Sequence, residues 1–120
     1  MRVFITGMGM VSAFGKSWDE IRAKFELGKN AVKYMRQWDR YEDLNTRLAA
    51  PIESYECPSS WDRKQLRSLG IVSMYSVEAA GLALRDAGLM RGENLDAASL
   101  DPSVQEGSLG VACGSSTGST

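Results

Sequence analysis

Histidine is absent from the 120 residues of the chain. An imidazole is the usual general base of Ser- and Cys-dependent hydrolases, so the chain cannot supply such a catalytic set by itself. Cys57 and Cys113 are the only cysteines. They are too few for a disulfide framework, and without a CxxC spacing or histidine they predict no metal site. We expect free thiols, a cytoplasmic location and no cofactor.

Long apolar runs and a strong charge of one sign are also lacking. No stretch approaches the roughly 18 apolar residues of a membrane span, and residues 1–11 lack the apolar region and cleavage site of a signal peptide. The formal net charge is −1, which leaves no electrostatic footprint for nucleic acid or an anionic membrane. The length fits one domain or a piece of a larger one.

The beginning of the chain predicts a strand followed by a helix. Residues 2–6 ("RVFIT") are β-rich with little alternation, which is typical of a buried strand. Residues 17–20 ("SWDE") match a capping box, and apolar residues then recur at helical spacing. We expect a helix over 17–27, with Gly28 as its stop signal.

The middle of the chain predicts an irregular excursion, a strand and a long helix. Residues 29–46 have no clean period, so we expect irregular chain with one helical turn. "RLAAPI" at 47–52 is typical of a strand that ends or lies at an edge near its proline. Apolar residues at spacings of three or four predict a helix over 60–87, which Gly70 and Gly81 interrupt without ending.

The last third predicts a polar connection and a second short strand. Gly88 stops the long helix, and Leu89 is placed for the hydrophobic contact that accompanies such a stop. Residues 90–107 are polar and contain an Asp-Pro turn signal, and 109–113 ("LGVAC") read as a buried strand. Strands that alternate with helices predict an α/β layered fold.

Two glycine-rich stretches carry weak binding signals. "GMGMVS" at 7–12 has the first two glycines of a dinucleotide-binding fingerprint, but its third position is Ser12 and the next helix begins too late. "GSSTGST" at 114–120 could cradle a phosphate, but it lacks the lysine of a P-loop. In both stretches we favour loops whose small residues allow close packing.

Cys113 has two interpretations. A small-residue turn after a strand is the shape of a nucleophile elbow, in which the cysteine would be catalytic. Without a histidine to activate it, a buried cysteine at a strand end is the better interpretation, because free cysteine usually packs as a small hydrophobe. Trp38 and Tyr41 are interpreted as packing anchors of the excursion, and the charges of "DRKQLRS" as a solvated helix start.

Four stretches, in order, resemble the elongating type I/II branch of the β-ketoacyl-acyl carrier protein synthases. They are "RVFITGMGMVSAFG" at 2–15, "RLAAPI" at 47–52, "DRKQLRSLGIVSMYSVEAAGLALRDAGL" at 62–89 and "GVACGSSTGS" at 110–119. The resemblance implies a thiolase-like fold of two similar halves, each a mixed sheet layered between helices. Residues 1–120 would be a partial N-terminal domain of that fold.

The resemblance also implies a reaction and its partners. The family performs a decarboxylative Claisen condensation of an acyl thioester with malonyl-carrier protein, in fatty acid or polyketide and polyene biosynthesis. Its partners are acyl carrier protein and malonyl or acyl thioesters. It usually forms a homodimer, or a heterodimer with a chain-length factor.

The resemblance assigns no catalytic residue to this chain. The family's Cys-His-His set lies beyond the stretch that resembles 110–119, and Cys113 matches a non-catalytic strand end. Thr117 matches the position of an apolar residue that gates the acyl pocket, so we expect it to bind substrate. The segment alone is expected to be inactive.

Two other functions stay open at this stage. A chain-length-factor-like subunit shares the fold but lacks the nucleophile, and nothing before residue 120 separates it from a synthase. An unrelated small α/β binding module would be complete at this length and would fold alone.

Overall fold

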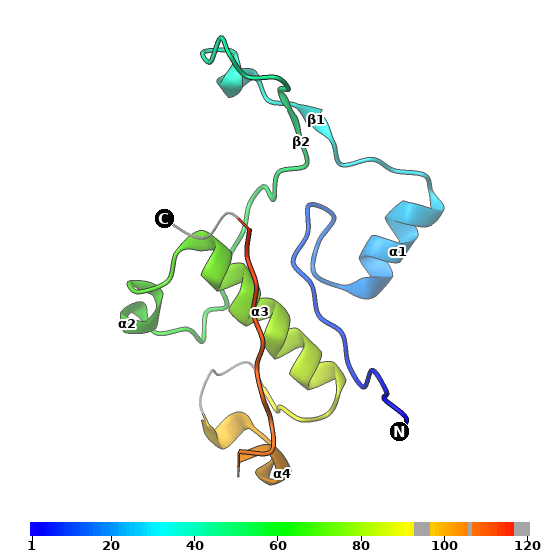
Figure 1. Ribbon diagram of the computed structural model, residues 1–120, viewed down its shortest axis with the longest axis vertical. Helices are drawn as coiled ribbons and strands as arrows, with labels where there is room; N and C mark the ends of the chain where they lie inside the picture. The colour runs from blue at the N-terminus through cyan, green and yellow to red at the C-terminus, as the bar shows by residue number, and fades with distance from the viewer. Residues whose placement is uncertain (93–96, 106, 117–120) are drawn as a thin grey trace. The chain divides into compact units, whose positions relative to one another are not determined.

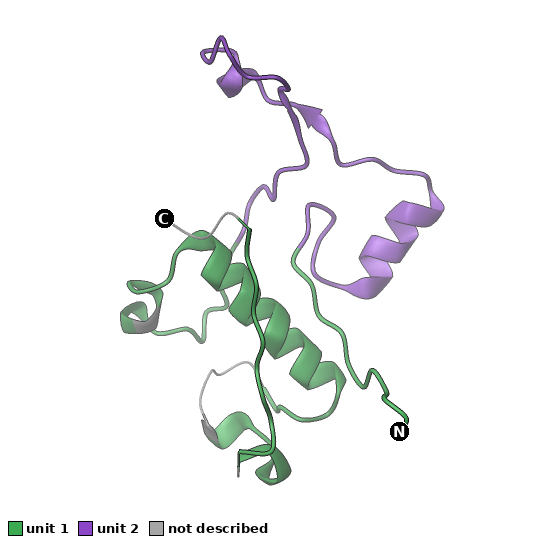
Figure 2. Cartoon of the chain, viewed as in Figure 1, with its two compact units in different colours: residues 1–11, 56–120 green, residues 12–55 purple. Residues whose placement is uncertain are grey.

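The computed structural model describes residues 1–92, 97–105 and 107–116 (Figure 1). The chain divides into two compact units (Figure 2). Unit 1 comprises residues 1–11 and 56–120, and unit 2 comprises residues 12–55. The described residues form helices and a small two-stranded sheet, which is compatible with the α/β class.

Helix α1 of unit 2 spans Trp18–Glu26 and confirms the predicted helix. Ser17 is its N-cap and has extended backbone, but its side chain makes no capping hydrogen bond, so the capping box is wrong. Gly28 ends the helix with φ +62°. Its N–H donates to the Phe25 carbonyl and that of Lys29 to the Lys24 carbonyl, both at 2.9 Å, which is the Schellman arrangement.

The excursion of unit 2 is a hairpin. Strand β1 (Lys33–Tyr34) pairs antiparallel with β2 (Leu48–Ala49), and the 3-10 helix η1 (Arg36–Trp38) lies between them. The predicted helical turn and the strand within 47–52 are confirmed. Strand β1 was not predicted, because two residues are too short to show an alternating pattern.

The single long helix predicted over 60–87 is wrong. Unit 1 instead has a short α2 (Arg63–Leu66) and a separate α3 (Ile71–Asp86). Gly70 is the N-cap of α3 and its backbone is extended (φ −73°, ψ 167°), so it separates the helices instead of lying inside one. Gly81 remains inside α3 and is buried.

Helix α3 ends as predicted. Gly88 has φ +72° and donates to the Arg85 carbonyl at 3.0 Å, while Leu89 donates to the Leu84 carbonyl at 2.8 Å. The connection that follows contains the 3-10 helix η2 (Ala97–Ser99) and the short α4 (Pro102–Gln105). Both elements fall inside the stretch that was predicted as a polar connection.

The two predicted buried strands are wrong for this structure. Residues 2–6 and 109–113 belong to no strand or helix, and all of them are exposed. Val3 and Val111 are each 81% exposed. A β-rich run becomes a buried strand only when neighbouring strands pair with it and cover it, and the described part of the chain places none beside these runs.

Residues 7–9 pack closely against α3 of unit 1. A Cβ placed on Gly9 would lie 2.7 Å from the Cβ of Leu82 and would overlap the Ala79 carbonyl oxygen. The Met8 N–H donates to the Asp86 carboxylate at 2.9 Å. We call this contact the glycine seam. It confirms that the glycines of "GMGMVS" serve close packing.

Candidate functional site

Cys113 is exposed, so its predicted burial is wrong. Residues 113–115 line a cavity of about 310 Å³ in unit 1, together with four residues of the first turns of α3: Val72, Ser73, Ser76 and Val77. Nothing in this lining is a base near neutral pH. A nucleophilic cysteine needs either a general base or a depressed pKa. The lining of this cavity offers the Cys113 thiol no general base.

Thr117, the predicted gate of the acyl pocket, lies outside the described residues, as do 118–120. Its role stays a prediction. The cavity beside Cys113 is the described space nearest to it in sequence.

Several amides of the loop after residue 6 are already hydrogen-bonded within the chain. The Met8 N–H is used by Asp86, and Ser12 and Gly15 exchange backbone hydrogen bonds of 3.1 Å in both directions. A dinucleotide site needs amides that point at a pyrophosphate on a helix N-terminus. The arrangement agrees with the packing interpretation of this loop.

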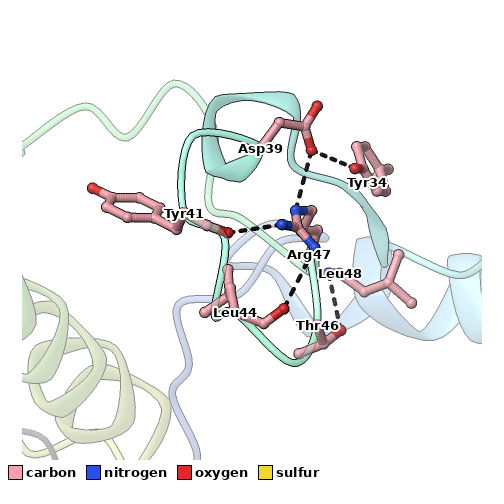
Figure 3. Close-up of polar contacts among 7 residues, drawn as sticks. All are labelled: Tyr34, Asp39, Tyr41, Leu44, Thr46, Arg47 and Leu48. Atoms are coloured by element: carbon pink, nitrogen blue, oxygen red, sulfur yellow. Dashed lines mark hydrogen bonds and ion pairs between the residues drawn. The ribbon is translucent and has the colours of Figure 1, made fainter.

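Arg47 organises the tip of the hairpin, which we define as residues 35–47 (Figure 3). Its guanidinium donates to the Tyr41 carbonyl at 2.7 Å and the Leu44 carbonyl at 3.4 Å, and it lies 3.3 Å from the Asp39 carboxylate. The Tyr34 hydroxyl donates to the same carboxylate, and this bond raises the pKa of Tyr34 above its usual 10.0. No sequence motif pointed to this cluster.

The aromatic residues of the tip are only partly packed. Trp38, Tyr41 and Leu44 surround a hollow of about 140 Å³, and Tyr41 remains 48% exposed. The guanidinium of Arg40 lies 4.7 Å from the centre of the Tyr41 ring, a cation–π geometry. The expected packing anchors therefore line a hollow of the tip and leave Tyr41 partly exposed.

The predicted solvated helix start carries a basic face. Arg63, Lys64 and Arg67 are exposed around α2, while the neighbouring Trp61 is buried. Within the described ranges, no group of three or more His, Cys, Asp or Glu side chains lies close enough together to hold a metal ion. No helix of the described part is long and apolar enough to cross a membrane.

The comparisons with curated proteins find 3-oxoacyl-[acyl-carrier-protein] synthases. Synthase 2 of Coxiella burnetii is 30% identical over 88 residues, which cover 73% of this chain and 21% of that protein. Synthase 2 of Vibrio cholerae is 27% identical over the same length and shares. Synthase 1 of Haemophilus influenzae is 27% identical over 119 residues, covering 98% of this chain and 26% of that protein. No protein-family model matches the chain.

Among solved structures, a β-ketoacyl synthase from Burkholderia phymatum is 54% identical, with a TM-score of 0.69. The match covers 77% of this chain and 22% of that one. The chain thus spans about a fifth to a quarter of the length of these relatives. On these matches, the chain belongs to the β-ketoacyl-acyl carrier protein synthases.

Proposed function

We propose that the chain forms part of a 3-oxoacyl-[acyl-carrier-protein] synthase. The observation that carries the proposal is the likeness to the Burkholderia phymatum synthase, at 54% identity and a TM-score of 0.69. The names of the curated relatives support acyl carrier protein as the partner. In this proposal the fold is thiolase-like and layered, and the synthase is a cytoplasmic dimer of fatty acid or polyketide biosynthesis.

The proposed reaction has two steps. An acyl group forms a thioester with an active-site cysteine, and malonyl-carrier protein then loses carbon dioxide. The resulting carbanion attacks the thioester carbonyl, which forms a carbon–carbon bond and releases the cysteine thiolate. Because the chain has no histidine, the two histidines of the Cys-His-His set must come from residues outside these 120, and in this proposal the cysteine does so as well.

The basic face around α2 supports a role in carrier-protein docking. Arg63, Lys64 and Arg67 are exposed within five residues of chain. Clustered exposed cations accelerate the encounter with a partner that presents an acidic face, and their effect weakens as salt rises. In the proposal this face steers acyl carrier protein toward the synthase.

Thr117 is proposed to set the size and polarity of the acyl pocket. A threonine is smaller than isoleucine and adds a hydroxyl, so it leaves room for a longer or more polar chain. Thr117→Ile in the full-length synthase should shift the products toward shorter acyl chains, measured by mass spectrometry. Ser116→Ala, one residue away, is the matched control. An unchanged product spectrum in Thr117→Ile contradicts the role.

The direct test is condensation by the full-length synthase that carries this chain. With acyl- and malonyl-carrier protein it should form 3-oxoacyl-carrier protein and release one carbon dioxide per condensation. Cys113→Ser should keep this activity, since Cys113 is not the proposed nucleophile. A protein that is inactive alone, but changes the chain length made by an added synthase, would be a chain-length factor and would overturn the proposal. A protein that is inactive alone and has no effect on an added synthase would overturn the proposal as well.

A further inference from the structure

Cys57 and Met74 bring two sulfur atoms together in unit 1. The Cys57 Sγ lies 3.6 Å from the Met74 Sδ, and the thiol donates to the thioether. Both side chains are half-buried. The residues are 17 positions apart in sequence, so their pairing comes from the fold and has no motif.

Local structure orders the backbone beside Cys57 and at Met74. Cys57 directly precedes a turn in which the Trp61 N–H donates to the Pro58 carbonyl at 3.0 Å, and Trp61 is buried. Met74 lies in the first turn of α3, where its N–H donates to the Gly70 carbonyl at 3.0 Å. Binding at residues whose nearby backbone is already ordered costs less conformational entropy.

We propose that Cys57 and Met74 form a two-sulfur site for a soft monovalent cation, Cu(I) or its analogue Ag(I). Thiolate and thioether are soft ligands, which select Cu(I) over harder ions. Metal–thiolate bonds are about 2.3 Å long, so two sulfurs that share one ion can lie up to about 4.6 Å apart. The observed 3.6 Å falls inside this limit. On binding, the Cys57 S–H bond breaks, a sulfur–metal bond forms and the proton leaves to solvent.

The surroundings make the site selective. Structural zinc takes four ligands, usually cysteine and histidine, and the described residues contain no cluster of three or more His, Cys, Asp or Glu.

Cys113 provides an internal comparison. It is exposed, and the cavity that it lines holds valine and serine side chains but no thioether.

The test is a competition for Cu(I) between the reduced, full 120-residue chain and the chromophoric chelator bicinchoninate. The chain should take up one Cu(I), and Cys57→Ser should abolish uptake. Met74→Leu, which keeps the side-chain volume, should weaken binding by at least the roughly 10–100-fold that loss of a supporting group costs a metal site. Cys113→Ser should bind as the original chain does, and Zn(II) should not displace Cu(I).

Far-UV circular dichroism shows whether each variant keeps its helices. If Met74→Leu perturbs them, Met74→Cys provides the second measurement, because it restores a sulfur donor and should recover binding. Uptake that survives Met74→Leu, or that is lost in Cys113→Ser, would show that single thiols bind the ion and would overturn the site. None of these outcomes depends on condensing activity.

Discussion

The tip of the hairpin in unit 2 and the glycine seam in unit 1 are held in opposite ways. In the tip, one long cationic side chain, Arg47, bonds to backbone carbonyls and a carboxylate. In the seam, the absence of side chains at Gly7 and Gly9 lets one backbone approach another. The first depends on directional polar contacts and the second on shape, so different substitutions should break them.

The largest effect is expected in the seam. Gly9→Val would place a Cβ against the backbone of Ala79 and 2.5 Å from the Ala83 nitrogen. Overpacking of this kind costs about 1–3 kcal/mol, and here the obstacle is a helix backbone that cannot rotate away. The free energy of unfolding, measured by urea titration of the 120-residue chain, should fall by that amount.

Gly110→Val is the matched control for the seam. No atom lies within 4 Å of a Cβ added there, so overpacking predicts a stability change within about 0.5 kcal/mol, as at an ordinary surface site. Equal losses in Gly9→Val and Gly110→Val would show that a general β-branched effect, not the seam, is responsible.

A smaller and more local effect is expected in the tip. Arg47→Ala removes two donors to carbonyls and the contact with Asp39. Hydrogen bonds from charged groups contribute about 1.5–3 kcal/mol each when buried. The side chain of Arg47 is 27% exposed and that of Asp39 is 52% exposed, so solvent screening reduces the total to about 1–2 kcal/mol.

Amide hydrogen exchange can locate the Arg47 effect. The Met35 N–H donates to the Arg47 carbonyl at 2.8 Å, and its exchange should accelerate in Arg47→Ala while the amides of α3 stay protected. Arg22→Ala is the control, because the Arg22–Glu26 pair is exposed on both sides and such pairs contribute little. Accelerated exchange throughout the chain would contradict a local role.

The same contrast explains what could be predicted from the sequence. Helix α1 was predicted because apolar spacing and Gly28 are local signals that act within a few residues. The runs at 2–6 and 109–113 were misread, because burial of a strand depends on distant neighbours. The break before α3 was missed because a glycine in a helical pattern can lie inside the helix, as Gly81 does, or separate two helices, as Gly70 does.

The functional residues divide in the same way. Membership of the family followed from motifs in order along the chain, which sequence reveals directly. The Arg47 cluster joins positions 34, 39, 41, 44 and 47 through the path of a loop, and the Cys57–Met74 pair joins segments 17 residues apart. Neither has a spacing that physical chemistry would single out before the fold is known.

The smallest expected effect is a pH dependence of the tip at the Tyr34–Asp39 hydrogen bond. The hydrogen bond to Asp39 favours the neutral phenol and raises the pKa of Tyr34 above 10.0. A group whose folded pKa is raised contributes stability that is complete below its unfolded pKa and is lost as the pH rises through the folded pKa. The contribution of the Tyr34–Asp39 bond to the tip should therefore be lost as the pH rises above 10. Difference absorbance at 295 nm between the original chain and Tyr34→Phe should titrate above pH 10, and Asp39→Ala should move the midpoint back toward 10.0. A midpoint at or below 10.0 in the original chain would contradict the Tyr34–Asp39 bond.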